Sequence, residues 1–207
     1  MRRPPKSQPQ RSLLRISGAV GSRSRQLLIT TWTGLPLEPS SPVQVAFLPE
    51  ITAYRGKLLS GTNRGTPVYA ASFIRQRRIV LETSLLSSPL VLRFMFVHEL
   101  FHFAWVRLGN VRRDQYSRLL RDELDSKARG ELGESSAVKK AELLVQGGLS
   151  LRQKIWSEYV CESFCDSAGS IFTDGPVHNG AKLGKDWTAL RHEWFLRNLG
   201  DEFRWTI

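Results

Sequence analysis

The sequence predicts one α+β domain in which a small mixed sheet precedes a long buried helix and a helical C-terminal half. Three observations predict this order: short β-branched apolar runs between residues 43 and 82, an apolar stretch at 89–108, and helical spacing of apolar residues beyond 111. The 207-residue chain is 41% hydrophobic and 24% charged, which is typical of globular domains and excludes a fibrous or largely disordered chain.

The N-terminal segment differs from the rest in composition. Seven basic residues precede the first acid, Glu38, and six prolines fall before residue 43. We therefore expect a basic, Pro-rich flexible arm over 1–42 and a single folded domain over 43–207. Nucleic-acid contact through residues 2–25 is a possible role for the arm, and a solvated leader is the other. No secretory signal is visible and Cys161 and Cys165 cannot build a disulfide framework, so we expect a cytoplasmic protein.

The elements follow from local signals in chain order. Strands are expected at 43–48, 68–74 and 79–82, separated by a Gly-rich and a basic segment. Ser88-Pro89 predicts the start of a helix and Gly109-Asn110 predicts its end. The apolar residues of this helix cover all its faces, which indicates burial, and the ionisable residues in its middle argue against a membrane span.

The remaining chain is predicted to be helical. A charge-dense, solvent-exposed helical pair is expected at 111–146, a long helix at 150–171 and an amphipathic helix rich in aromatics at 187–205. Arg191 and Arg197 are expected in solvent, and the two cysteines are expected to be packing residues.

A metal-binding pattern lies inside the apolar helix, at His98-Glu99-Leu100-Phe101-His102. Histidines four residues apart project from one helical face, so both imidazoles can reach one Zn²⁺ ion while Glu99 addresses a water molecule. Burying two histidines and a glutamate in an apolar helix lowers the stability of the fold unless these side chains are paired or bound to metal. The pattern therefore predicts a zinc site with His98 and His102 as ligands and Glu99 as general base.

A third ligand is expected from the helix at 150–171. Glu158, Glu162 and Asp166 recur there at intervals of four and so share one face. A carboxylate one turn beyond a metal-binding glutamate can accept the distal N–H of a zinc-bound histidine. Two registers fit: Glu158 on zinc with Glu162 behind a histidine, which we prefer, or Glu162 on zinc with Asp166 behind it.

Together these segments resemble the gluzincins, zincin-type metallopeptidases in which a later helix donates a glutamate as third zinc ligand. The run 158–164 is similar to the lethal-factor-like pattern, and 162–166 is similar to the thermolysin-type pattern. The resemblance implies a zincin-like fold and an edge strand before the active-site helix along which a peptide lies, here Ile79, Val80 and Leu81.

The function expected from the resemblance is zinc-dependent hydrolysis of polypeptides by an endopeptidase. His178, in a loop after the ligand helix, is a candidate for stabilising the oxyanion. Two alternatives remain open: a non-catalytic zincin-like module that binds peptides, and a SprT-like or ImmA-like protease that uses the basic arm to associate with DNA.

Overall fold

The computed structural model describes residues 13–145, 149–173, 175, 180, 182–199 and 205–207, and these form a mixed α+β fold. The strands are β1 (Leu14–Ser17), β2 (Leu37–Glu38), β3 (Val43–Leu48), β4 (Ile51–Tyr54), β5 (Lys57–Ser60), β6 (Thr66–Pro67), β7 (Ala70–Phe73), β8 (Arg78–Glu82) and β9 (Trp205–Thr206). The α-helices are α1 (Ser22–Gly34), α2 (Pro89–Arg107), α3 (Asn110–Asp125), α4 (Glu134–Val145), α5 (Leu149–Phe172) and α6 (Lys185–Leu199).

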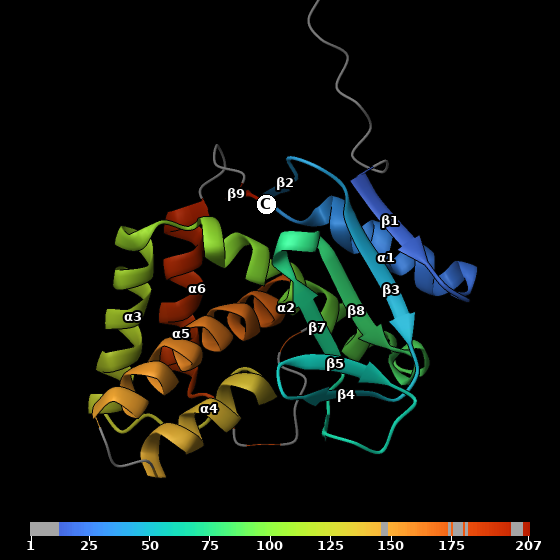
Figure 1. Ribbon diagram of the computed structural model, residues 1–207. Coiled ribbons are helices and arrows are strands. Elements are labelled where there is room, and N and C mark those ends of the chain that lie inside the picture. Colours follow the sequence, from blue (N-terminus) through green and yellow to red (C-terminus); the bar gives the residue numbers. More distant parts are fainter. Residues whose placement is uncertain (1–12, 146–148, 174, 176–179, 181, 200–204) are drawn as a thin grey trace, which may run out of the picture.

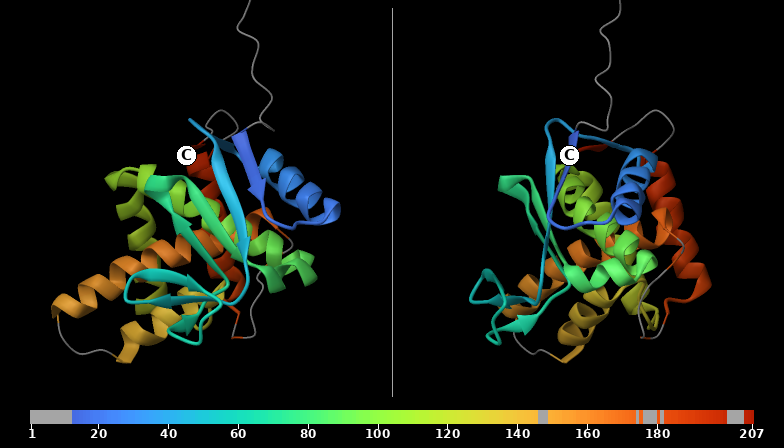
Figure 2. Two further views of the ribbon diagram at one scale, coloured as in Figure 1. Left: turned by 45° about the vertical axis from the view of Figure 1, so that its right-hand side comes forward. Right: turned by 90° about the vertical axis from the view of Figure 1, so that its right-hand side faces the viewer.

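The main sheet is mixed, as predicted, with the strand order β1-β3-β8-β7. The strands β1, β3 and β8 run parallel, and β7 runs antiparallel to β8. Figure 2 shows the helices gathered on one face of this sheet. A second, three-stranded sheet of order β5-β4-β6 lies at one end of the main sheet, close to β7 (Figure 1).

The edge strand differs from the prediction. Ile79, Val80 and Leu81 belong to β8, which pairs with β3 on one side and β7 on the other, and their side chains are almost completely buried. Their backbone groups are therefore used within the sheet. The edge strand of the main sheet that lies beside α2 is β7. The chain reverses through a 3₁₀ turn at Ile74–Gln76, which places the earlier strand, β7, outside β8.

The prediction of a flexible arm over 1–42 is wrong for the part that the structure describes. β1 pairs with β3 in the main sheet, and α1 packs against α2. Leu28, Trp32 and Leu35 are buried in the core. The free energy gained by burying these apolar side chains stabilises the segment despite the prolines and arginines around it. Residues 1–12 lie outside the described residues.

Helix α2 is the centre of the core. Pro89 occupies its first turn, and Ser88 precedes it as the N-cap residue without a side-chain capping bond. By length and composition α2 is the one described helix apolar enough to cross a membrane, but 56% of that stretch is buried inside the protein. The sheet packs on one side of α2, and α5 makes its most extensive helix contact on another.

Candidate metal centre

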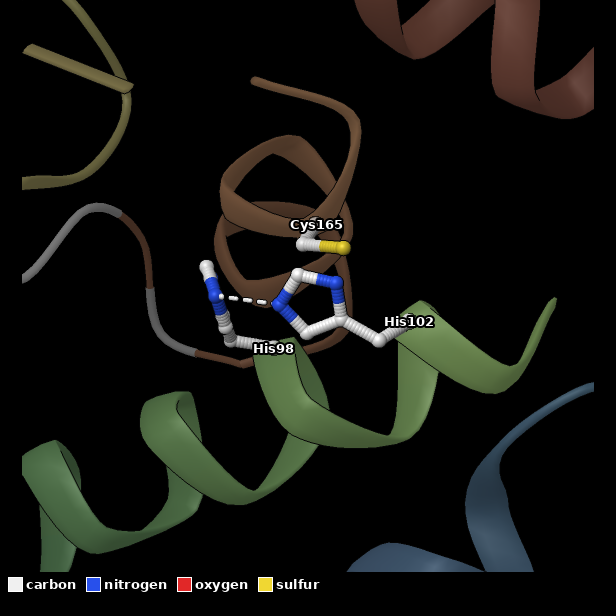
Figure 3. Close-up of side chains that lie close together, drawn as sticks. All are labelled: His98, His102 and Cys165. Carbon is white, nitrogen blue, oxygen red and sulfur yellow. Dashed lines mark hydrogen bonds between the residues drawn. The ribbon is translucent and has the colours of Figure 1, made fainter. Parts of the chain in front are cut away.

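Helices α2 and α5 bring two histidines and a glutamate to one point. The Nε2 atoms of His98 and His102 lie 3.2 Å apart, and Oε2 of Glu162 lies 3.2 Å from Nε2 of His98 and 3.8 Å from Nε2 of His102. Figure 3 shows both imidazoles projecting from α2 toward α5. The four-residue spacing along α2 places the rings on one face, as predicted.

The triangle formed by these three atoms fits a zinc ion. Ligand bonds of the usual length for zinc to imidazole nitrogen or carboxylate oxygen place neighbouring ligands of a tetrahedron about 3.4 Å apart. The observed separations of 3.2, 3.2 and 3.8 Å bracket that value. Two imidazoles and a carboxylate are also the donor types that zinc takes in catalytic sites.

Two cysteines lie close to the same cluster. Ligand atoms of His98, His102 and Cys165 lie within 4.8 Å of one another, as do those of His102, Cys161 and Glu162. Cys165 is completely buried and projects from α5 beside the imidazoles (Figure 3), whereas Cys161 lines the cavity. The cluster could therefore hold a metal ion through histidine and either carboxylate or sulfur donors.

Asp166 supports His98 from behind. Its Oδ1 lies 2.7 Å from Nδ1 of His98, and its Oδ2 accepts the backbone N–H of Ser136, in the first turn of α4, at 2.8 Å. Asp166 is 1% exposed, so both contacts are shielded from water. A Cβ atom at Gly133 would overlap this carboxylate, which explains a glycine there. In the second of the two predicted registers Asp166 lies behind a histidine, and in the structure Asp166 contacts His98.

Glu158 does not join the cluster, so the preferred register is wrong in this structure. Its carboxylate pairs with Lys139 at 2.9 Å and with Lys154 at 3.8 Å, and its side chain is 37% exposed. Glu158 lies one turn before Glu162 on the same face of α5. In that position Lys139 of α4, rather than an imidazole of α2, is its nearest charged partner.

Glu99 faces the same cavity as the two histidines. The cavity has a volume of about 780 Å³ and is bounded by α2, β7, α4 and α5. The hydroxyl of Ser72, on β7, donates to the Glu99 carboxylate and lies 2.9 Å from the Glu99 carbonyl oxygen. Glu99 is 4% exposed, so Ser72 fixes a buried carboxylate beside the histidines. Local sequence carries no signal for this serine, because the pairing depends on β7 being the edge strand.

The cluster is strongly coupled electrostatically. Burial alone lowers the pKa of a histidine, but the contact with Cys161 and the charge of Glu162 raise the pKa of His102 to about 9. Asp166 and Glu162 likewise outweigh burial and raise the pKa of His98 well above its usual value. Burial raises the pKa of Glu162, yet the two histidines lower it to about 2. The site therefore stabilises positive charge on the two imidazoles.

A buried ion network braces the elements behind the site. Arg191 of α6 is completely buried, not solvated as predicted. It donates to both carboxylate oxygens of Glu123 at 2.8 and 2.6 Å and to Glu131 at 2.9 Å. Glu131 also accepts from Tyr159 of α5 and pairs with Lys140 of α4. The charge-dense segment is thus partly internal, because its acids neutralise an arginine that burial would otherwise destabilise.

His178 lies outside the described residues, so its predicted role has no structural counterpart. No family model, curated protein or solved structure matches this chain.

Proposed function

We propose that the chain is a zinc-dependent metallopeptidase in which His98, His102 and Glu162 hold the metal and Glu99 is the general base. The convergence of the three ligand atoms, with separations of 3.2 to 3.8 Å, is the observation that carries the proposal. The presence of Glu99 on the wall of the same cavity favours catalysis over a purely structural site, since a structural zinc site has no use for an extra carboxylate.

Within this proposal the site uses the thermolysin-type register of the gluzincins. Glu162 acts as third ligand, and Asp166 accepts the distal N–H of His98. Bound there, zinc supplies the Lewis acidity that polarises a peptide carbonyl and makes water a stronger nucleophile. Glu99 accepts a proton from the attacking water and delivers it to the leaving amine, while Ser72 keeps the carboxylate in place.

Strand β7 offers the backbone groups that an extended peptide needs. Tyr69 accepts the backbone N–H of Glu82 at 2.8 Å, so it forms a hydrogen-bonded pair across to β8, and Ala71 follows the same alternation. The intervening residues, Ala70 and Ser72, therefore direct their N–H and C=O groups away from β8. In the described sheets β7 has a strand neighbour on one side only, which leaves these groups for a substrate strand.

The cavity favours substrates with apolar side chains on both sides of the cleaved bond. Val91 and Met95 line it toward the start of α2, and Trp105 and Val106 line it toward the end. The distance along the helix from Val91 to Val106 is about 22 Å, from a rise of about 1.5 Å per residue, which matches roughly six residues of extended peptide.

The test combines metal analysis with one isosteric variant. Purified protein is assayed for zinc and for cleavage of a peptide library, beside Glu99→Gln and the control Glu193→Gln, which changes an exposed glutamate on α6. We expect stoichiometric zinc in all three proteins and cleavage lost only in Glu99→Gln. Absence of zinc from the wild type would refute the metal centre. Zinc without any peptide cleavage would refute the peptidase and favour a module that only binds peptides.

A role for residues 2–25 in binding nucleic acid stays a prediction. In the described part of this segment, Arg25 donates to the carbonyl oxygen of Ile16, so at least one of its basic side chains contributes to the fold.

A further inference from the structure

The two histidines of the cluster are held by different residues of α5. Both Nε2 atoms face the shared point, so each Nδ1 atom faces away from it. Nδ1 of His98 contacts Asp166 at 2.7 Å, and Nδ1 of His102 contacts Sγ of Cys161 at 3.5 Å. Cys161 is the one partner of that nitrogen recorded among the described residues.

A metal bound to Nε2 of His102 determines which hydrogen-bonding role is left for Cys161. A histidine that binds a metal through Nε2 carries its proton on Nδ1, so Nδ1 of His102 becomes a donor. His102 is mostly buried, with 19% of its side chain exposed, and a buried N–H group without a partner destabilises the arrangement. A contact of 3.5 Å suits sulfur, which is larger than oxygen, and a thiol sulfur is a weak acceptor.

The three groups that contact the imidazoles come from one short stretch of α5. Cys161 comes one residue before Glu162, and Asp166 comes four residues after it. Two consecutive turns of α5 therefore present an acceptor for His102, a ligand for the metal and an acceptor for His98. The rigid helix keeps these three groups at fixed separations while α2 supplies both imidazoles.

We propose that Cys161 is a positioning residue of the metal centre, whose sulfur accepts the Nδ1–H of His102 and so orients that imidazole toward the metal. This inference rests on the proposed function, because it requires a metal on the two Nε2 atoms. Removing this acceptor leaves the Nδ1–H of a mostly buried imidazole without its partner, so metal affinity is sensitive to residue 161.

The test measures zinc affinity by competition with a chelating indicator for the wild type, Cys161→Ala and Cys161→Ser. Alanine removes the acceptor, whereas serine keeps one in nearly the same place. Ser157→Ala, one turn earlier on the exposed side of α5, controls for substitution in this helix. We expect about tenfold weaker zinc binding for Cys161→Ala, the lower end for residues that support metal ligands, with affinity restored by serine and unchanged in the control.

Cobalt spectra and circular dichroism separate the competing outcomes. Unchanged zinc affinity in Cys161→Ala would overturn the role of Cys161, and so would an equal loss in Cys161→Ser with altered helix content, which indicates a packing role. A sulfur-to-cobalt charge-transfer band that disappears in Cys161→Ala would also overturn it, because the thiolate would then be a ligand. Wild-type protein that binds neither metal would instead refute the proposed function, which keeps the two failures distinct.

Discussion

Exchanging single carboxylates of α5 for amides separates the two possible zinc ligands. Glu162→Gln removes the negative charge that lies 3.2 Å from Nε2 of His98, whereas Glu158→Gln removes a partly exposed partner of two lysines. The two substitutions are chemically identical and lie one helical turn apart. Any difference in metal affinity between them therefore reports position alone.

The expected difference is large. Zinc-finger peptides bind structural zinc through four ligands with a free energy of about 10–16 kcal/mol. An equal share for each ligand is about 3–4 kcal/mol, or roughly two to three orders of magnitude in the dissociation constant. Glu158→Gln loses surface ion pairs worth up to about 1 kcal/mol of folding free energy and no metal contact. We therefore expect Glu162→Gln to bind zinc at least about a hundredfold more weakly than Glu158→Gln.

The assay is isothermal titration of apo-protein with zinc, with chelator competition for the tight binders. Circular dichroism of each variant establishes that the helices are intact before the affinities are compared. Equal affinities in the two variants, or a larger loss in Glu158→Gln, would show that the convergence on Glu162 is not the metal site.

Three further predictions concern protons, packing and stability. Zinc must displace the proton that His102 holds with a pKa of about 9. The apparent zinc affinity therefore rises with pH up to about pH 9, by about tenfold per pH unit for each proton released. Zinc titrations at several pH values that show no such rise would contradict this. Gly133→Ala displaces the carboxylate of Asp166 from His98 and weakens zinc binding about tenfold, whereas an unchanged affinity would mean that the carboxylate yields without loss. Arg191→Met leaves the buried Glu123 without its two contacts and lowers the free energy of unfolding by about 3–5 kcal/mol in urea titrations, and a loss below about 1 kcal/mol would contradict the network.

The N-terminal segment shows where composition is an incomplete guide. Its prolines and arginines predict a flexible arm, but Leu28 and Trp32 have apolar surface that becomes buried only when α1 meets α2. Composition records how many apolar residues a segment has, and it does not record whether a complementary surface exists elsewhere in the chain. The same reason explains Arg191, whose burial depends on two glutamates contributed by distant segments.

The grouping of the two histidines with Glu99 depends on local geometry, whereas the choice of the carboxylate that meets them does not. His98, Glu99 and His102 lie within one turn of a single helix, whose pitch alone fixes their common face, so the sequence determined their grouping. Glu158, Glu162 and Asp166 share one face of α5 equally well, and helical periodicity cannot rank them. Where α5 crosses α2 decides that Glu162 meets the imidazoles.

The sequence by itself determined the boundaries of α2 and the spacing of the two histidines, because each depends on interactions between residues close in the chain, and the order of strand-like and helix-like segments indicated the α+β class. Only the tertiary structure decided that β7 is the edge strand, that Glu162 rather than Glu158 meets the histidines, and that Ser72 and Cys161 support the site. These outcomes depend on how separate elements pack. Packing angle and strand order are set by the summed burial of many side chains across the whole fold, and no short stretch of sequence contains that sum.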